Sequence, residues 1–286
     1  TVKQGAADDI LINSTGVVNG TAGGGVIIDS NHKLNNQGSI LIGNLSNVVG
    51  VDVAAGVTSG LTIGGKITVD EPFTPTDADN DGDLDGPFAT GSNRIGIRTN
   101  GAFIGNIVVG STGAITVEGN NSASITLGGP LTGNFAHDGK TNVLGNNSVG
   151  IQLSDVNGNV RLAGEISAQG QDNVAVRSTG NVTGAMTIQG KIASSGYRYT
   201  VSPTDPSKLD ADDLLQGGPA VSIEGSVGQG IILAIPPKDS STTDPDEDDD
   251  GIDDNKEGTA SVASYGAAPA MRIGSVGNIA IGATQG

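Results

Sequence analysis

The sequence has no cysteine and no tryptophan, and only seven of its 286 residues are phenylalanine or tyrosine. The absence of cysteine excludes a disulfide framework and a thiolate metal site. No apolar run approaches the ~20 residues of a membrane-spanning helix, and the first ten residues lack the pattern of a signal peptide. We expect no transmembrane segment in this chain, and either a leader that was removed or a piece of a longer protein.

Positive charge is also scarce, with 14 basic against 31 acidic residues and a net charge of −17. Such a surface repels phosphates, so nucleic acid is not an expected partner. Of the acidic residues, 21 fall within residues 70–90, 204–216 and 236–258, and the rest of the chain is close to neutral. The pattern predicts a neutral body that carries three acidic insertions, which we place at 70–92, 197–218 and 236–268.

Glycine is abundant, with 47 residues, and the many valine, isoleucine, asparagine and threonine residues favour strands and turns over helices. A pattern of apolar, small, apolar and polar residues recurs eight times. Its third position falls at Ile28, Val51, Ile97, Ile125, Ile151, Val176, Val221 and Met271. The gaps are about 25 residues except where an acidic segment intervenes, which is typical of a stacked solenoid.

Each repeat continues with two more alternating segments, separated by glycine or asparagine, as in GNVRLAGEISAQG (158–170). Three strands per repeat predict an all-β fold, a single-stranded parallel β-helix of about nine coils in one domain over residues 1–286. Coils ~4.8 Å apart place the apolar positions in one inward column. The next residues form an outward polar stripe: Asp52, Arg98, Thr126, Gln152, Arg177, Ser222 and Arg272.

The second position of the pattern is small, from Gly96 and Ser124 to Ala270. Either these residues form an outward strip onto which a loop packs, or they ease a bend after a corner. The three insertions are expected to leave from one corner of the solenoid. We expect the second and third to touch on adjacent coils, with the first about four coils, or ~19 Å, away.

The first insertion contains DADNDGDLD, with Gly82 at the sixth position of a calcium loop. Alternate carboxylates on a tightly turning chain point at a common centre, and glycine permits the sharp bend. Phe88 takes the twelfth position, where a bidentate glutamate is usual, so a backbone oxygen, water or a neighbouring loop must complete the shell. The candidate calcium ligands are Asp77, Asp79, Asp81, Asp83 and Asp85.

The third insertion contains DEDDDGIDDNKE, which satisfies the full D-x-D-x-D-G-x₅-E spacing. Its candidate ligands are Asp246, Asp248, Asp250, Asp254 and Glu257. Over about a dozen residues it resembles the helix-free calcium loops of thrombospondin type 3 repeats. The second insertion, with Asp205, Asp210, Asp212 and Asp213, lacks this spacing and is expected to lend at most one ligand. The alternative to calcium is a hydrated acidic loop.

Signals for catalysis are absent from the sequence: it has no nucleophile elbow, P-loop or zinc-protease motif. His32 and His137 lie in turn-like segments without a second ligand at metal spacing, and we expect both at the surface. A β-helix enzyme that cleaves polysaccharides needs clustered carboxylates on its body, and no such pair is evident. We do not expect an enzyme.

Coils such as KLNNQGSILIG (33–43) and GNVTGAMTIQGKIASSG (180–196), with no cysteine and few aromatics, resemble the passenger regions of proteobacterial autotransporters. The resemblance implies a secreted β-helix on the bacterial outer surface. The first hypothesis is a structural or adhesive module whose calcium-ordered loops contact a host or cell-surface glycan or protein. The alternatives are a self-assembling surface-layer or filament subunit and, third, an enzyme acting on polysaccharide.

Overall fold

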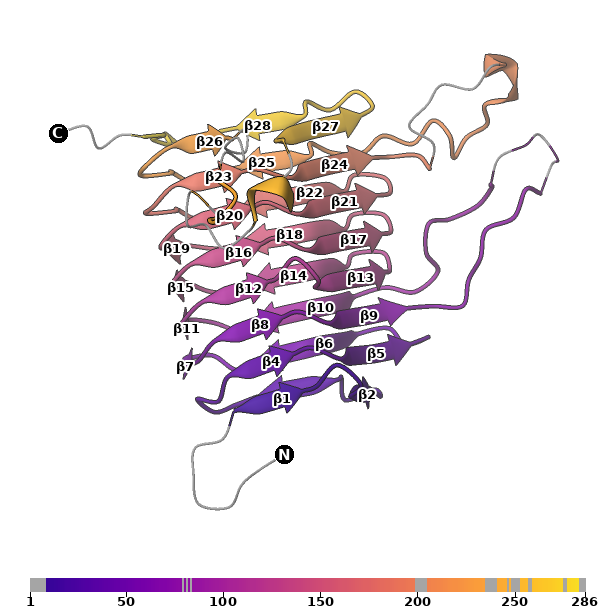
Figure 1. Ribbon diagram of the computed structural model, residues 1–286. Helices are drawn as coiled ribbons and strands as arrows, with labels where there is room; N and C mark the ends of the chain where they lie inside the picture. Colours follow the sequence, from indigo (N-terminus) through magenta and orange to yellow (C-terminus); the bar gives the residue numbers. More distant parts are fainter. Residues whose placement is uncertain are drawn as a thin grey trace.

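The structure is a computed structural model, and it describes residues 9–78, 80, 82, 84–198, 205–234, 241–245, 247, 253–256, 259–274 and 277–282. The described chain is nearly all β, with three parallel sheets of eight strands and a shorter parallel sheet of four (Figure 1). Two single 3₁₀ turns, Pro206–Lys208 (η1) and Asp254–Lys256 (η2), lie in insertions. The arrangement is that of a solenoid and is consistent with a parallel β-helix.

The chain visits the sheets in a fixed order, I, II, III and, in the middle of the molecule, IV. We call one such pass a coil. Sheet I contains β1 (Ile10–Ile12), β4 (Leu34–Asn36), β8 (Leu61–Ile63), β12 (Ile107–Val109), β16 (Phe135–His137), β20 (Val160–Leu162), β23 (Met186–Ile188) and β26 (Ile231–Leu233). Sheet II contains β2 (Val17–Asn19), β5 (Ser39–Gly43), β9 (Lys66–Asp70), β13 (Ala114–Glu118), β17 (Lys140–Leu144), β21 (Glu165–Gln169), β24 (Lys191–Ser195) and β27 (Ser261–Tyr265).

Sheet III carries the repeated sequence pattern. Its strands are β3 (Val26–Ile28), β6 (Val48–Val53), β10 (Arg94–Thr99), β14 (Ala123–Leu127), β18 (Val149–Leu153), β22 (Val174–Ser178), β25 (Val221–Ile223) and β28 (Met271–Ile273). Sheet IV contains β7 (Val57–Thr58), β11 (Phe103–Ile104), β15 (Leu131–Thr132) and β19 (Val156–Asn157).

One hydrophobic core cluster runs through the solenoid from Ile12 to Val227. The predicted inward column is confirmed, because its residues are successive register partners from Val51 to Met271. The prediction for the first copy is wrong: Val51 pairs with Val26, and Ile28 stacks on Val53. A shift of two residues keeps the same face of the strand inward. The alternation of apolar residues is therefore equally compatible with the predicted and the observed register.

The stacking of the polar stripe is confirmed by the same registers, from Asp52 to Arg272, although Ser222 within it is buried. The small residues beside it do not form an outward strip. Ser124, Ala175 and Ala220 are buried, and a Cβ at Gly96 would meet the side chain of Ile115 in sheet II. Two consecutive inward residues bend the strand, and only a small side chain fits on the inside of that bend.

Asparagine and aspartate close the corner before sheet III. Asn47, Asn93, Asn121, Asn147 and Asp172 have positive φ, between 52° and 59°. These residue types tolerate the left-handed conformation, because their short polar side chains form local hydrogen bonds. The asparagines that separate alternating segments in the sequence thus lie at corners of the solenoid.

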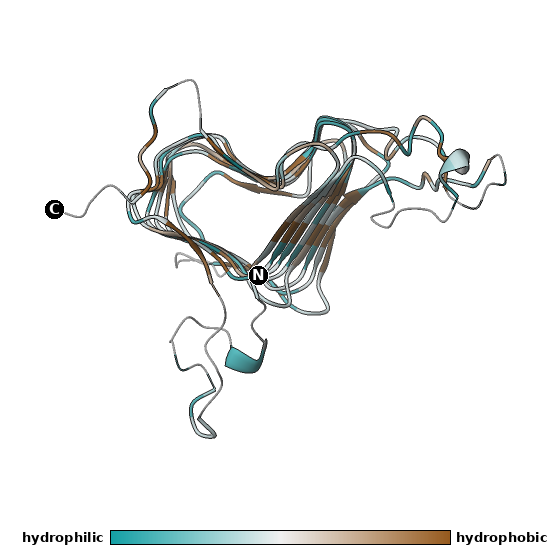
Figure 2. Ribbon diagram, turned by 90° about the horizontal axis from the view of Figure 1, so that it is seen from above, coloured by the Kyte–Doolittle hydropathy of each residue, from teal (hydrophilic) through white to brown (hydrophobic). Residues whose placement is uncertain are grey.

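The first and second insertions leave from that same corner, between β9 and β10 and between β24 and β25. The third links β26 of sheet I to β27 of sheet II, so the prediction of one common corner is wrong. Figure 2 shows the insertion with η1 and the insertion with η2 projecting from different corners. The boundary 236–268 is also wrong, because Ser261–Tyr265 is a body strand that pairs with β24.

The two histidines differ. His32 lies in a half-exposed turn, as expected, with Nδ1 2.7 Å from Ser30 Oγ. The prediction for His137 is wrong: it ends β16 and is fully buried between Val109 and Leu162. Its alternation with Phe135 directs it inward, although the Asp-Gly sequence that follows is typical of a turn.

Candidate functional site

The first and second insertions meet outside the solenoid, although their bases lie on separate coils. The Arg198 guanidinium donates hydrogen bonds to three carbonyl oxygens of the first insertion, at 2.8–3.1 Å: those of Leu84, Gly86 and Pro87. It also lies over the ring of Phe88, 4.5 Å from the centroid, a cation–π arrangement. We call this contact, between residues 84–88 and the segment of Arg198 and residues 210–213, the loop junction.

This junction replaces the contact that we predicted between the second and third insertions. The third insertion leaves from a different corner, so the geometric reason for that contact does not hold. Phe88, which takes the place of the missing twelfth-position glutamate, is 6% exposed and packs beneath Arg198. Its role in the described structure is to hold the two insertions together.

Three carboxylates converge at the loop junction. Asp212 Oδ2 accepts a hydrogen bond from the Gly86 N–H at 2.8 Å, which brings it beside Asp85. Asp85, Asp210 and Asp212 each place a carboxylate oxygen within 4.8 Å of those of the other two. Calcium binds oxygen at 2.3–2.6 Å, so one ion between these residues would reach all three.

The electrostatics of the junction fit a cation-binding role. Burial and the neighbouring Asp210 raise the pKa of Asp212, while the hydrogen bond with Asp212 lowers the pKa of Asp210. Two carboxylates this close repel unless a proton or a cation lies between them. A divalent ion between the two carboxylates would neutralise their charge.

The predicted ligands of the first insertion are partly described. Asp79, Asp81 and Asp83 lie outside the described residues. Asp77 Oδ2 accepts a hydrogen bond from the Gly82 N–H at 3.1 Å, and Gly82 has φ of 108°, so glycine does provide the sharp bend. Asp85 accepts a hydrogen bond from the Ala78 N–H. These contacts close the segment into a compact loop, with Asp85 at the side that faces the second insertion.

In the third insertion, Asp246, Asp248, Asp250 and Glu257 lie outside the described residues. Asp254 is described and is 5% exposed. Its N–H donates to the carbonyl of Pro245 at 2.7 Å, and its carboxylate oxygens lie 3.3 Å from the Glu247 N–H. These contacts close the loop around Asp254, and calcium binding by the third insertion stays a prediction.

A buried ion pair that the sequence reasoning missed fixes the base of the first insertion. Arg94 Nη1 lies 2.7 Å from Glu71 Oε2, and the two side chains are 2% and 3% exposed. The same guanidinium donates to the carbonyls of Leu45 and Glu118, at 2.5 and 2.6 Å. Burial alone would raise the pKa of Glu71, but hydrogen bonds from Arg94 and nearby backbone N–H groups lower it. The sequence signal for this ion pair was the opposite charges of Glu71 and Arg94 at the two ends of the insertion.

A pair of carboxylates on the body was also missed. Asp70 and Glu118 are neighbours on sheet II, because the residues before them, Val69 and Val117, are register partners. Burial raises the pKa of Glu118, and the charges of Asp70 and Glu71 raise it further. These residues are far apart in the sequence, so no local motif showed the pair. Such a pair on the body is what the alternative of a polysaccharide-cleaving enzyme requires.

Comparisons with protein-family models, with curated protein sequences and with solved structures found no match for this chain. Within the described part of the chain, no helix is long and apolar enough to span a membrane.

Replacing Arg198 with leucine is expected to separate the two insertions without unfolding the body. Leucine still covers part of Phe88 but donates no hydrogen bonds to the three carbonyls of the first insertion. We expect amide hydrogen exchange of residues 84–88 to rise by about tenfold or more, since each charged hydrogen bond contributes roughly 1.5–3 kcal/mol. Arg177→Leu, which removes an arginine of the polar stripe, is the matched control. Equal exchange in the two variants would contradict the role of Arg198.

Proposed function

We propose that the chain is a secreted or cell-surface binding module in which calcium joins two loops on a rigid β-helix. In this proposal the helix is single-stranded, with about nine coils of about 25 residues in one domain over residues 1–286. The observation that carries the proposal is the convergence of Asp85, Asp210 and Asp212, from two insertions, within 4.8 Å. With calcium bound, the loop junction becomes one ordered platform.

Calcium coordination also indicates how the platform would bind a partner. Calcium takes six to eight oxygen ligands, and three aspartates supply only part of that shell. The remaining positions are open to water, to backbone oxygens or to the hydroxyl groups of a glycan. A host or cell-surface glycan is therefore our preferred ligand, with a surface protein as the second candidate.

The proposed location is the bacterial outer surface. Extracellular calcium modules work at about 10⁻⁴–10⁻³ M affinity, which a partly exposed site with three carboxylates suits. The lack of cysteine and the glycine- and asparagine-rich coils support the resemblance to autotransporter passenger regions. The third insertion, with its complete calcium-loop spacing, would carry a second ion at the other corner.

Calcium is expected to protect the loop junction, and Asp212→Asn is expected to abolish that protection. Loss of one of three charged ligands should weaken binding at this site by about tenfold or more, because affinity follows the number of charged ligands. Hydrogen exchange with calcium and with chelator, read at residues 84–88 and 205–213, separates this site from the third insertion. Asp213→Asn changes the same charge one residue away and serves as the control.

Two results would overturn the metal-linked platform. One is an exchange rate at the loop junction that calcium leaves unchanged. The other is an Asp213→Asn variant that loses calcium as completely as Asp212→Asn does. Glycan-array binding with and without calcium then tests the ligand class. If the chain instead cleaves acidic polysaccharides, and Glu118→Gln abolishes cleavage, the enzyme alternative replaces the binding module.

A further inference from the structure

Six N-x-S/T sequons, the acceptor pattern for N-linked glycosylation, occur in the sequence. They begin at Asn13, Asn19, Asn44, Asn120, Asn146 and Asn181. A chain rich in asparagine, serine and threonine also produces this pattern by chance, so the sequence does not distinguish among the six. A transferase must reach both the acceptor amide and the hydroxyl group two residues later. The structure separates the six sequons by that requirement.

The sequons of Asn120 and Asn146 are built into the body. Their hydroxyl residues, Ser122 and Ser148, are 4% and 0% exposed. Asn120 Oδ1 accepts a hydrogen bond from the Asn146 N–H at 2.8 Å, and Asn120 Nδ2 donates to the carbonyl of Ala89 at 2.9 Å. A transferase could reach these groups only after local opening of the coil.

The sequon of Asn181 is exposed, but its amide is fixed to the neighbouring coils. Asn181 Oδ1 accepts a hydrogen bond from the Ser226 N–H at 2.9 Å, and the Asn181 N–H donates to Asp155 Oδ1 at 2.8 Å. This ladder holds the carboxamide against the body, so it cannot turn outward without breaking a hydrogen bond between coils.

The other three sequons are accessible at the surface. In each, both the asparagine and the hydroxyl residue are exposed: Asn13 with Thr15, Asn19 with Thr21 and Asn44 with Ser46. Within the described part of the chain, the Nδ2 atoms of these three asparagines donate no hydrogen bond. Thr15 Oγ1 donates to Asn13 Oδ1 at 3.2 Å, so the hydroxyl group and the amide of this sequon lie together in one turn. Such an amide can enter a transferase site while the fold stays intact.

The three accessible asparagines lie on the first two coils, around the outer face of sheet II. Asn13 lies in the turn before β2, Asn19 ends β2, and Asn44 follows β5, the neighbouring strand (Figure 1). On the same outer face, Val17 and Leu41 are 56% and 36% exposed, and Leu41 is the register partner of Asn19. A glycan here would cover two exposed apolar side chains. Asn44 belongs to the second coil, so its exposure does not depend on the chain before the first.

We propose that Asn13, Asn19 and Asn44 are N-glycosylation sites. The co-reactant is a sugar that carries a phosphate leaving group at its anomeric carbon. A bond forms between asparagine Nδ2 and that carbon as the bond from the carbon to the phosphate oxygen breaks. The electron pair of the broken bond leaves with the phosphate, and the amide proton passes to a base of the transferase. The sites lie on the body, so they do not depend on calcium or on the proposed binding function.

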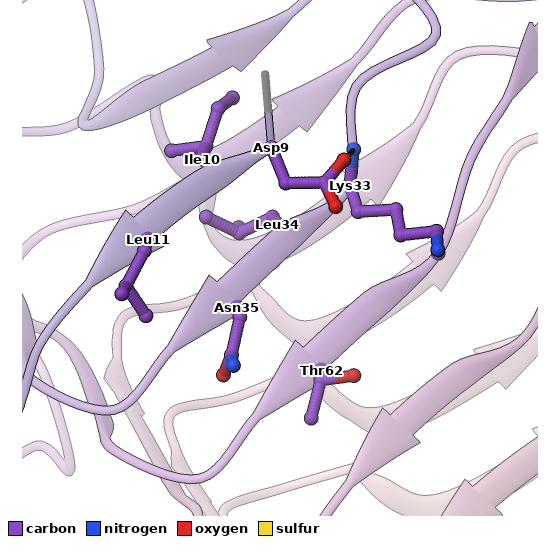
Figure 3. A pocket seen from close by; sticks show the side chains of 8 residues that line it. Asp9, Ile10, Leu11, Lys33, Leu34, Asn35 and Thr62 are labelled. Carbon is purple, nitrogen blue, oxygen red and sulfur yellow. Dashed lines mark hydrogen bonds between the residues drawn. The ribbon is translucent and has the colours of Figure 1, made fainter. Parts of the chain in front are cut away.

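Asn35 provides an internal control for exposure without a sequon. It lies on the second coil at a shallow pocket on the outer face of sheet I, whose lining also includes Lys33 and Thr62 (Figure 3). Its side chain is half-buried and faces outward. Gln37 takes the place of the hydroxyl residue, so we expect Asn35 to stay unmodified.

Glycopeptide mapping by mass spectrometry, on the chain isolated from the cells that produce it, tests the proposal. We expect a sugar on the peptides that contain Asn13, Asn19 and Asn44, and none on those that contain Asn35 or Asn146. An unmodified asparagine at any of the three sites overturns its assignment. A sugar on Asn146 overturns the argument that burial of the hydroxyl residue protects a sequon.

Thr15→Val is expected to abolish modification of Asn13, because it removes the hydroxyl group of the sequon. Ser14→Ala is the matched control, since it removes the neighbouring hydroxyl group but keeps the sequon. Both residues are exposed, and equal thermal melting of the two variants shows that they remain folded. A sugar that persists in Thr15→Val but is lost in Ser14→Ala would show attachment to Ser14 instead, and would overturn the assignment of Asn13.

A second measurement tests the structural argument by itself. The folded chain is treated with UDP-glucose and a purified N-glucosyltransferase that recognises sequons, and each rate is divided by that of a short peptide of the same sequence. We expect Asn13, Asn19 and Asn44 to react about tenfold or more faster than Asn120 and Asn146, because the latter two require local opening of the coil. Equal relative rates at all five would overturn the argument.

Discussion

Replacing Arg94 with methionine is expected to lower the free energy of unfolding by about 3–5 kcal/mol, because it leaves the Glu71 carboxylate buried without its cation. Glu71 and Arg94 are 3% and 2% exposed, so water cannot readily take the place of the guanidinium. The substitution also removes the donors to the carbonyls of Leu45 and Glu118, which belong to the coils on either side. Chemical denaturation of both proteins measures the difference.

Arg98→Met is the matched control, because it makes the same change on the same strand. Arg98 holds Asp52 by two hydrogen bonds, at 2.9 and 2.8 Å, and lowers its pKa. The side chains of that pair are 36% and 25% exposed, so its loss should cost only about 0–1 kcal/mol. Similar losses in the two variants would show that burial does not set the strength of the Arg94 pair. The insertion between residues 71 and 93 should lose exchange protection only in Arg94→Met.

The solenoid could be predicted from the sequence because every coil must fit the same cross-section. A stacked inward position favours a similar apolar side chain in each coil, and the inward column of sheet III repeats as Ile97, Ile125, Ile151, Val176 and Val221. The corners repeat for the same reason, with Asn121, Asn147 and Asp172 in the left-handed conformation. Such constraints are local and recur in each coil, so one sequence is enough to reveal them.

The corner of the third insertion could not be predicted, because its returning strand has a weak apolar pattern. In β27 the inward residues are Val262 and Ser264, which follow an acidic segment and resemble a loop.

The loop junction was missed for a different reason. Asp85 and Asp212 are far apart in sequence, and their contact depends on how two long insertions bend toward each other across several coils, which no repeat encodes.

Some signals for the junction were nevertheless present. Phe88 at the twelfth position predicts that a backbone oxygen, water or a neighbouring loop completes the coordination shell, and the second insertion is expected to lend at most one ligand. The structure brings two of its aspartates, Asp210 and Asp212, beside Asp85 rather than one. The sequence motif thus located the loop, and only the fold could identify the residues that face it.

His137 is expected to make the body sensitive to acid. It is fully buried, with Nε2 2.8 Å from Thr141 Oγ1, and burial lowers its pKa from 6.5 to about 4. Above pH 6.5 both the folded and unfolded states hold a neutral imidazole, so stability is unaffected by this group. As the pH falls from 6.5 toward about 4, only the unfolded state takes up the proton, and folding loses about 3 kcal/mol over that window.

Replacing His137 with leucine, which suits its position between Val109 and Leu162, should remove this loss. Carboxylates whose pKa is lowered in the fold, such as Asp52 and Glu71, also lose stability in acid, but they do so in both proteins. The difference between the two curves of unfolding free energy against pH therefore isolates the histidine. His32→Leu, at the half-exposed histidine, should follow the wild-type curve. A His137→Leu curve parallel to that of the wild type between pH 6.5 and 4 would show that the buried imidazole takes up its proton without opening the core.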